Sequence, residues 1–140
     1  MKDLLNNIDV KTVLAPVSIS DTTARVGAVI DRHGFDSLTY VIALGAIADA
    51  DATFVVLLEE SDASDMAGAV AVDDAFLLGT EALAAFKFDS DNGCRKLGYI
   101  GGKRYTRMTI TPVGNSGAAL FGVLALLGHP VYAPTANPPA

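Results

Sequence analysis

Apolar and polar positions alternate in short runs along most of the chain, which is typical of β-strands rather than helices. The run RVGAVI, residues 25–30, has a period of two and leads to an expected turn at His33 and Gly34. Residues 10–19 are rich in β-branched side chains, but Pro16 has no N–H to donate to a neighbouring strand. This strand is therefore predicted at a sheet edge or at a point where the chain changes sheets.

Two longer apolar runs follow. Residues 38–47 are almost continuously apolar, which is typical of a strand covered on both faces. Residues 53–62 form a second strand that becomes polar toward its end. Because a short turn, DADAT, separates the two runs, we expect them to form an antiparallel hairpin.

The middle of the chain has weaker patterns. A short strand or loop is expected at 69–72 and a turn of helix at 73–78. The piece EALAAF has helical propensity, but Gly68 and Gly79 interrupt any long helical period. Residues 89–93, DSDNG, have strong turn chemistry.

Two more strands, 94–101 and 103–113, are expected to form a second hairpin around Gly101-Gly102, and 118–128 reads as a last buried strand or a short helix. Roughly seven to eight short strands predict an all-β fold, an antiparallel β-sandwich or jelly-roll-like single domain with at most a short helix. The domain is placed at 1–130. The tail 131–140 is Pro-rich and is expected to be extended and tied to a neighbouring subunit.

The composition of the chain suggests that it associates with other subunits. The chain has 140 residues, enough for one domain, and is 51% hydrophobic but only 19% charged. Part of the apolar surface is thus expected to be buried against other subunits. The longest apolar run, Gly117 to Gly128, is shorter than the roughly 20 residues of a membrane helix. The first residues lack a signal-peptide core, so a soluble protein that is not exported is expected.

Charge is segregated along the chain. Between Asp49 and Asp91 lie eleven acidic residues and one basic residue, Lys87. Five of the ten basic residues then fall between Arg95 and Arg107, and no Asp, Glu, Lys or Arg follows. Such blocks form either solvated faces or complementary surfaces that meet on neighbouring copies.

No complete catalytic or cofactor motif is present. The stretch GYIGGKRYTRMTIT, residues 98–111, has a Gly-Lys pair, but a phosphate loop needs a Ser or Thr where Arg104 stands and a helix where the pattern predicts a strand. DSDNG lacks the spacing of a calcium loop. His33 and His129 belong to no zinc pattern. We therefore predict no enzyme, no cofactor and no metal.

Cys94 is the only cysteine, so no disulfide within the chain and no Cys-based metal site can form. Its neighbours Arg95 and Lys96 could activate the thiol, but a passive strand cysteine is the preferred interpretation. Tyr99 and Tyr105 lie among basic residues, a mixture also found in single-strand nucleic-acid platforms. The net charge of −6 argues against nucleic acid as a partner.

Three segments, ATFVVLLEESDASD, VDDAFLLGTEA and KLGYIGGKRYTRMTITP, occur in an order and spacing that resemble small virion structural proteins encoded beside the major capsid gene of tailed phages and prophages. The resemblance covers residues 36–134. Its most specific part lies within 96–107, where these positions match: Gly98, Tyr99, Gly101, Lys103, Arg104, Tyr105 and Arg107. DASDMAGAV is looser than the corresponding turn of that group.

The resemblance implies a non-enzymatic capsid decoration or cement protein, assembled in the bacterial cytoplasm into the virion. Its partners would be the major capsid protein and copies of itself. A neck or tail-tube structural protein is the alternative, and a β-sandwich module for carbohydrate or a host surface is a lesser one. The subunit contact is predicted at the basic stretch: Lys96, Tyr99, Lys103, Arg104, Tyr105 and Arg107.

Overall fold

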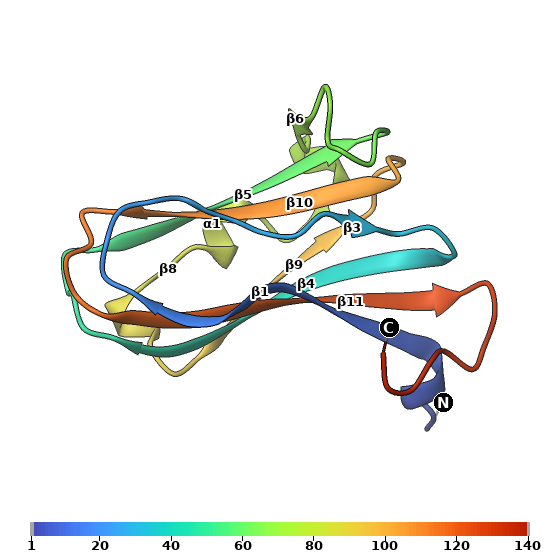
Figure 1. Ribbon diagram of the computed structural model, residues 1–140, viewed down its shortest axis with the longest axis horizontal. Helices are drawn as coiled ribbons and strands as arrows, with labels where there is room; N and C mark the ends of the chain where they lie inside the picture. Colours follow the sequence, from blue (N-terminus) through green and yellow to red (C-terminus); the bar gives the residue numbers. More distant parts are fainter. Residues whose placement is uncertain (1, 140) are drawn as a thin grey trace.

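Two antiparallel sheets pack face to face in this computed structural model, which describes residues 2–139 (Figure 1). Sheet A has the strand order β1 (Ile8–Ile19), β11 (Ala119–Pro130), β4 (Phe35–Ile47), β9 (Cys94–Tyr99) and β7 (Leu77–Leu78). Sheet B has the order β2 (Arg25–Val26), β10 (Tyr105–Val113), β5 (Thr53–Ser61) and β6 (Val70–Ala71). In addition, β3 (Ile30–Asp31) pairs with β10, and β8 (Phe86–Lys87) pairs with β5. The predicted β-sandwich is confirmed.

The core lies between the sheets and follows from the period-two pattern of the strands. Along β4 the side chains of Leu38, Tyr40 and Ile42 point inward and are fully or almost fully buried, while the residues between them are more exposed. At one end of the core Phe54 stacks on Phe86 with ring centroids 4.8 Å apart. Both rings also meet a third phenylalanine edge to face.

Helical structure in residues 2–139 is confined to short pieces. They are one turn of α-helix, α1 (Glu81–Ala84), and three 3₁₀ turns, η1 (Leu5–Asn7), η2 (Asp74–Phe76) and η3 (Phe88–Ser90). The Thr80 hydroxyl caps α1 by accepting a hydrogen bond from the Leu83 N–H. The expected short strand, helical turn and DSDNG turn of the middle segment all occur, as β6, η2 and the turn after η3. No helix among the described residues is long and apolar enough to cross a membrane.

Both predicted hairpins are wrong. β4 belongs to sheet A and β5 to sheet B, so residues 48–52 cross between the layers, and 100–104 likewise cross from β9 to β10. β4 pairs instead with β11, which follows far along the chain, and with β9. An alternating pattern shows which face of a strand is buried, but it does not identify the partner strand.

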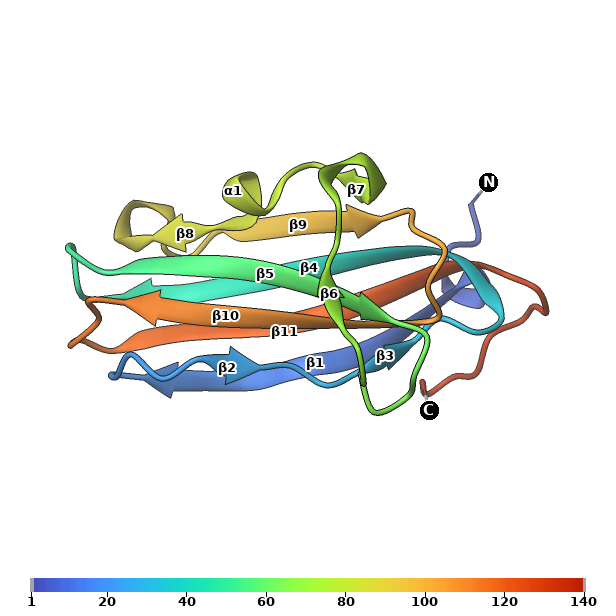
Figure 2. The same cartoon turned by 90° about the horizontal axis from the view of Figure 1, so that it is seen from above.

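Residues 25–31 form two short strands rather than the single predicted strand, because their middle bridges the two sheets. The Gly27 N–H donates to the Met108 carbonyl of sheet B, and the next N–H, of Ala28, donates to the Val13 carbonyl of sheet A. A side chain at Gly27 would collide with both neighbours. This segment closes one long edge of the sandwich, and α1 and β8 lie at the other (Figure 2).

β1 forms the edge of sheet A, as predicted from Pro16. The pairing of β1 with β11 shifts register between Thr12 and Leu14 and again between Leu14 and Val17, so Pro16 lies in an irregular stretch. The tail returns to the N-terminal segment of its own chain, where the Thr135 N–H donates to the Asn6 carbonyl. The expected attachment of the tail to a neighbouring subunit stays a prediction.

Candidate functional site

The stretch that carries the family resemblance builds the arch between β9 and β10. The Tyr99 side chain is only 1% exposed, and its hydroxyl accepts a hydrogen bond from the Lys103 N–H over 3.0 Å. The same hydroxyl donates to a carboxylate oxygen of Glu60 over 2.5 Å. Gly101 leaves the space for this ring, since a β-carbon there would lie 2.5 Å from the Tyr99 hydroxyl oxygen. A strand follows the arch, so this loop is not the strand-to-helix turn of a phosphate site.

Arg32 fixes the arch from the opposite edge of sheet B. Its Nε donates to the Lys103 carbonyl over 2.6 Å, and a terminal nitrogen donates to the Gly101 carbonyl over 3.0 Å. The guanidinium carbon lies 5.3 Å from the centre of the Tyr99 ring. Sequence reasoning missed Arg32, because a single arginine before a predicted turn carries no signal of a partner about 70 residues away.

Burial, together with the hydrogen bond to Glu60, raises the pKa of Tyr99 to about 12. The hydroxyl therefore remains a donor at neutral pH. The sequence predicts Tyr99 as a subunit contact, but in the single chain its side chain is buried and contacts the core and the arch.

Three of the other predicted contact residues already have acidic partners in their own chain. Lys103 lies 2.5 Å from Asp62, Arg104 lies 2.8 Å from Asp31, and Arg107 lies 3.1 Å from Glu59, as measured between charged nitrogen and carboxylate oxygen. The acidic and basic blocks of the sequence thus meet within one molecule. A role of these residues at a subunit contact stays a prediction, and it would have to compete with this internal pairing.

Tyr105 and Lys96 complete the predicted set, but they lie on different sheets. Tyr105 begins β10 and has the Arg104 guanidinium carbon 5.1 Å from its ring centre. Lys96 lies on β9 with an exposed side chain. The predicted contact is therefore not one continuous basic strip.

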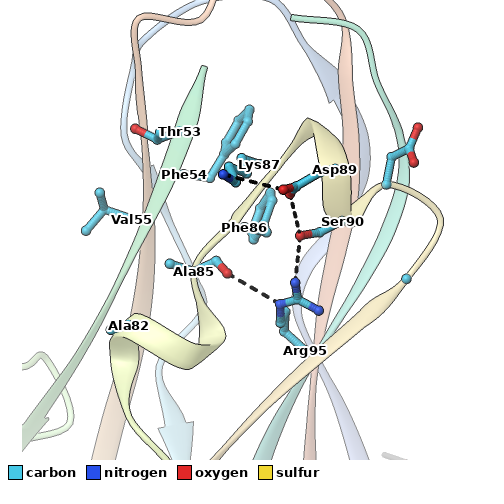
Figure 3. A pocket seen from close by; sticks show the side chains of 12 residues that line it. Thr53, Phe54, Val55, Ala82, Ala85, Phe86, Lys87, Asp89, Ser90 and Arg95 are labelled. Atoms are coloured by element: carbon cyan, nitrogen blue, oxygen red, sulfur yellow. Dashed lines mark hydrogen bonds and ion pairs between the residues drawn. The ribbon is translucent and has the colours of Figure 1, made fainter. Parts of the chain in front are cut away.

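A hollow of about 770 Å³ lies between α1, β8, η3 and the start of β5 (Figure 3). A chain of polar contacts forms one wall: Arg95 donates to the Ser90 hydroxyl over 2.6 Å, and that hydroxyl lies 3.3 Å from the Asp89 carboxylate. Lys87 pairs with the same carboxylate at 3.4 Å. The buried rings of Phe54 and Phe86 also line the hollow. The polar side chains of this wall thus form hydrogen bonds and an ion pair with one another.

Chemically reactive side chains are scattered. Among residues 2–139, no group of three or more His, Cys, Asp and Glu side chains is placed to hold a metal ion. Cys94 is a free, exposed thiol on β9. His129 lies 3.0 Å from the Ser37 hydroxyl at the end of β11. His33 follows β3 in a turn.

The outer face of sheet A, called face A below, is almost free of charge. Leu120 and Leu124 are 43% and 39% exposed, although an antiparallel sheet facing water normally alternates apolar and polar residues. The outward positions of its strands include Val10, Thr12, Thr39, Val41, Ala43, Cys94, Lys96, Leu120, Leu124 and Leu126. Lys96 is the one charged member.

The outer face of sheet B, called face B below, has the same character. Val26 and Val55 are 57% and 50% exposed. The Arg107–Glu59 ion pair lies at one end of the face. The outward set between that pair and the far end of β10 is Val26, Thr53, Val55, Leu57, Thr109, Thr111 and Val113. Lys87, paired in register with Thr53, adds a charge at that end and forms an ion pair with Asp89.

Faces A and B explain part of the sequence pattern. The apolar run of residues 38–47 predicted a strand covered on both faces, yet Ala43 on its outer side is exposed in the single chain. The outward-pointing apolar residues were thus visible in the sequence. Their gathering into two continuous faces depends on the strand order, which the sequence did not reveal.

Comparison with known proteins gives no family. The sequence matches no protein-family model and no curated protein. Among solved structures, a Clostridium thermocellum endo-1,4-β-D-xylanase 10B fragment containing CBM22-1 and GH10 modules is similar over 94% of this chain and 30% of its own, with 10% identity and a TM-score of 0.46. A family two carbohydrate esterase from Cellvibrio japonicus is similar over 91% of this chain and 36% of its own, with 12% identity and a TM-score of 0.36. This chain spans about a third of either structure, and these values assign it no activity.

Proposed function

We propose that the protein is a non-enzymatic structural component of a phage virion, a capsid decoration or cement protein that binds copies of itself and the major capsid protein. The observation that carries this proposal is the pair of faces rich in exposed apolar side chains and poor in charge, A and B, on opposite sides of one small domain. Large exposed apolar patches mark interaction sites, and each apolar Å² buried contributes roughly 25 cal/mol. Two such faces fit a subunit with neighbours on both sides.

The polar residues support the same role. Six basic side chains form ion pairs within the chain: Lys11, Arg25, Lys87, Lys103, Arg104 and Arg107. These pairs neutralise charge within one molecule. The exposed apolar side chains of faces A and B are then the surfaces left for contact with neighbouring subunits.

A neck or tail-tube protein of the same virion would need the same surfaces. A module for carbohydrate or a host surface would instead present neighbouring exposed aromatic rings. The most exposed aromatic residues here come from three separate segments: Phe76 from η2, Phe88 from η3 and Tyr132 from the tail. No feature of the described residues favours this third role.

The test is to add the purified protein to heads of its phage assembled without it, and to locate it by electron microscopy. The proposal predicts regular density on the head lattice. Density confined to the neck or tail would support the alternative, and absence of binding to any part of the particle would contradict a virion role.

A further inference from the structure

We infer that face A, around Lys96, docks a segment of the capsid subunit in which a carboxylate side chain is flanked by apolar side chains. This inference rests on the proposed function and names the chemistry of the partner. It is carried by two features that lie side by side on face A, an apolar hollow and an unpaired cation.

The hollow lies where η1 and the start of β1 meet β4 and the end of β11, and has a volume of about 360 Å³. Most of its lining is apolar, from Leu4, Ile8, Val41 and Leu126. Besides Lys96, the polar lining comes from Asn7, Ser37, Thr39 and His129. The hollow thus provides a mainly apolar binding site for a partner side chain on face A.

Lys96 stands at the border of this hollow. It is paired in register with Val41 on the neighbouring strand, and it also lines a second hollow beside Leu78 and Leu83 at the sheet edge. Leu78 and Leu83 are both exposed. The Lys96 side chain therefore borders apolar residues in both hollows, and Arg95 also lines the second one.

Lys96 differs from most other basic residues of the chain. Within the described range, 2–139, no acidic group lies within ion-pair distance of it, whereas six other basic residues have such a partner. Arg32 and Arg95 donate to carbonyl groups. A single cation next to an apolar hollow is complementary to a carboxylate carried on an apolar segment.

A second copy of the chain supplies no such carboxylate from its own face A. The outward positions of β1, β4, β9 and β11 are occupied by apolar residues, small residues, Thr and Lys96, without Asp or Glu. Face-to-face contact of two copies would leave both Lys96 ammonium groups in apolar surroundings, which is unfavourable. Charge therefore disfavours contact between the A faces of two copies, and the capsid subunit is the partner inferred for face A.

The experiment measures binding of the full chain to phage heads assembled without it, by co-sedimentation at low and moderate salt. Lys96→Glu is expected to weaken binding by roughly tenfold or more, and Lys96→Met to remove most of the salt dependence. Lys87→Glu is the matched control, since it makes the same change of net charge at an exposed lysine on β8, which belongs to sheet B. Thermal unfolding of each variant checks that it folds.

The outcomes separate this inference from the proposed function. If the wild-type protein binds heads and Lys96→Glu binds equally well, the docking inference is overturned while the virion role stands. If Lys96→Glu abolishes self-association but leaves binding to heads intact, face A meets a second copy, and the inference is again overturned. If the wild-type protein does not bind heads, both the docking inference and the proposed function are contradicted.

Discussion

The hydroxyl oxygens of Tyr40 and Thr106 lie 2.6 Å apart in the middle of the core and join the two sheets. Tyr40 comes from β4 in sheet A, Thr106 from β10 in sheet B, and neither residue is exposed. Burial raises the pKa of Tyr40, so its hydroxyl stays protonated and available for this bond. This polar pair among apolar neighbours adds a directional contact between the two sheets.

Removing one partner of this pair should destabilise the fold. Thr106→Val leaves the Tyr40 hydroxyl buried without a partner, at an expected cost of about 1–3 kcal/mol in the free energy of unfolding. The double variant Tyr40→Phe with Thr106→Val removes both hydroxyls and should regain most of that loss. Urea unfolding of the two variants measures the difference. A double variant that is less stable than Thr106→Val would contradict this account.

Adjacent glycines in the arch should respond differently to the same substitution. Gly101→Ala places a β-carbon against the buried Tyr99 ring and should cost about 1–3 kcal/mol by overpacking. Gly102→Ala meets no atom within 4 Å and has an ordinary backbone conformation, so its stability should stay near that of the wild type. Thermal unfolding compares the two. Equal stability of both variants would show that Gly101 is not needed for the position of Tyr99.

These glycines illustrate what the sequence reveals about the fold. The strand positions followed from alternation, because burial of one face imposes a period of two on any strand. The role of Gly101 could not be predicted from the sequence. Gly101 faces the hydroxyl of Tyr99, and this contact arises only because the chain passes from sheet A to sheet B here. Glycine occurs both in hairpin bends and in arches between sheets, so composition alone does not separate them.

The Asp31–Arg104 pair should act within the molecule rather than between molecules. Both side chains are about half exposed, so Arg104→Glu should lower the melting temperature only slightly, through repulsion from Asp31. The charge swap Asp31→Arg with Arg104→Asp should restore stability. We expect the swapped protein also to bind phage heads as the wild type does. If it folds but fails to bind, Arg104 contacts a neighbouring subunit, as its sequence predicts.

Asp49 should make the fold sensitive to acid. Hydrogen bonds from the Ser116 N–H and hydroxyl and from the Asp51 N–H hold the pKa of Asp49 below its usual range. Because the folded-state pKa is the lower one, this stabilisation is complete above the unfolded-state pKa, near 4, and is lost as the pH falls through the folded-state value.

Asp49→Asn should therefore lose less stability than the wild type between about pH 5 and pH 2, measured by chemical unfolding at each pH. Asp51→Asn is the control, since its side chain accepts none of the three bonds that Asp49 receives. An identical pH dependence of the wild type and Asp49→Asn would count against the role of these bonds.

The candidate contact surface could be predicted only in part. The acidic and basic blocks were visible in the sequence, but their mutual neutralisation depends on pairs such as Lys103 with Asp62, which are 41 residues apart. Lys96 belongs to the same basic block, yet it remains unpaired because β9 turns it to the outer face of sheet A. The high apolar content of the sequence indicated association with other subunits. That Leu124 and Val55 are among the exposed apolar residues could not be predicted without the strand order.

The most direct test of the central claim is the mass of the protein in solution and on particles, compared with that of Leu124→Glu on face A and Val55→Glu on face B. The account predicts that the wild type sediments as a multiple of 14.5 kDa or decorates heads in a regular array, and that at least one variant stays folded but loses this association. A wild-type protein that remains at 14.5 kDa at all concentrations and binds no particle would contradict it.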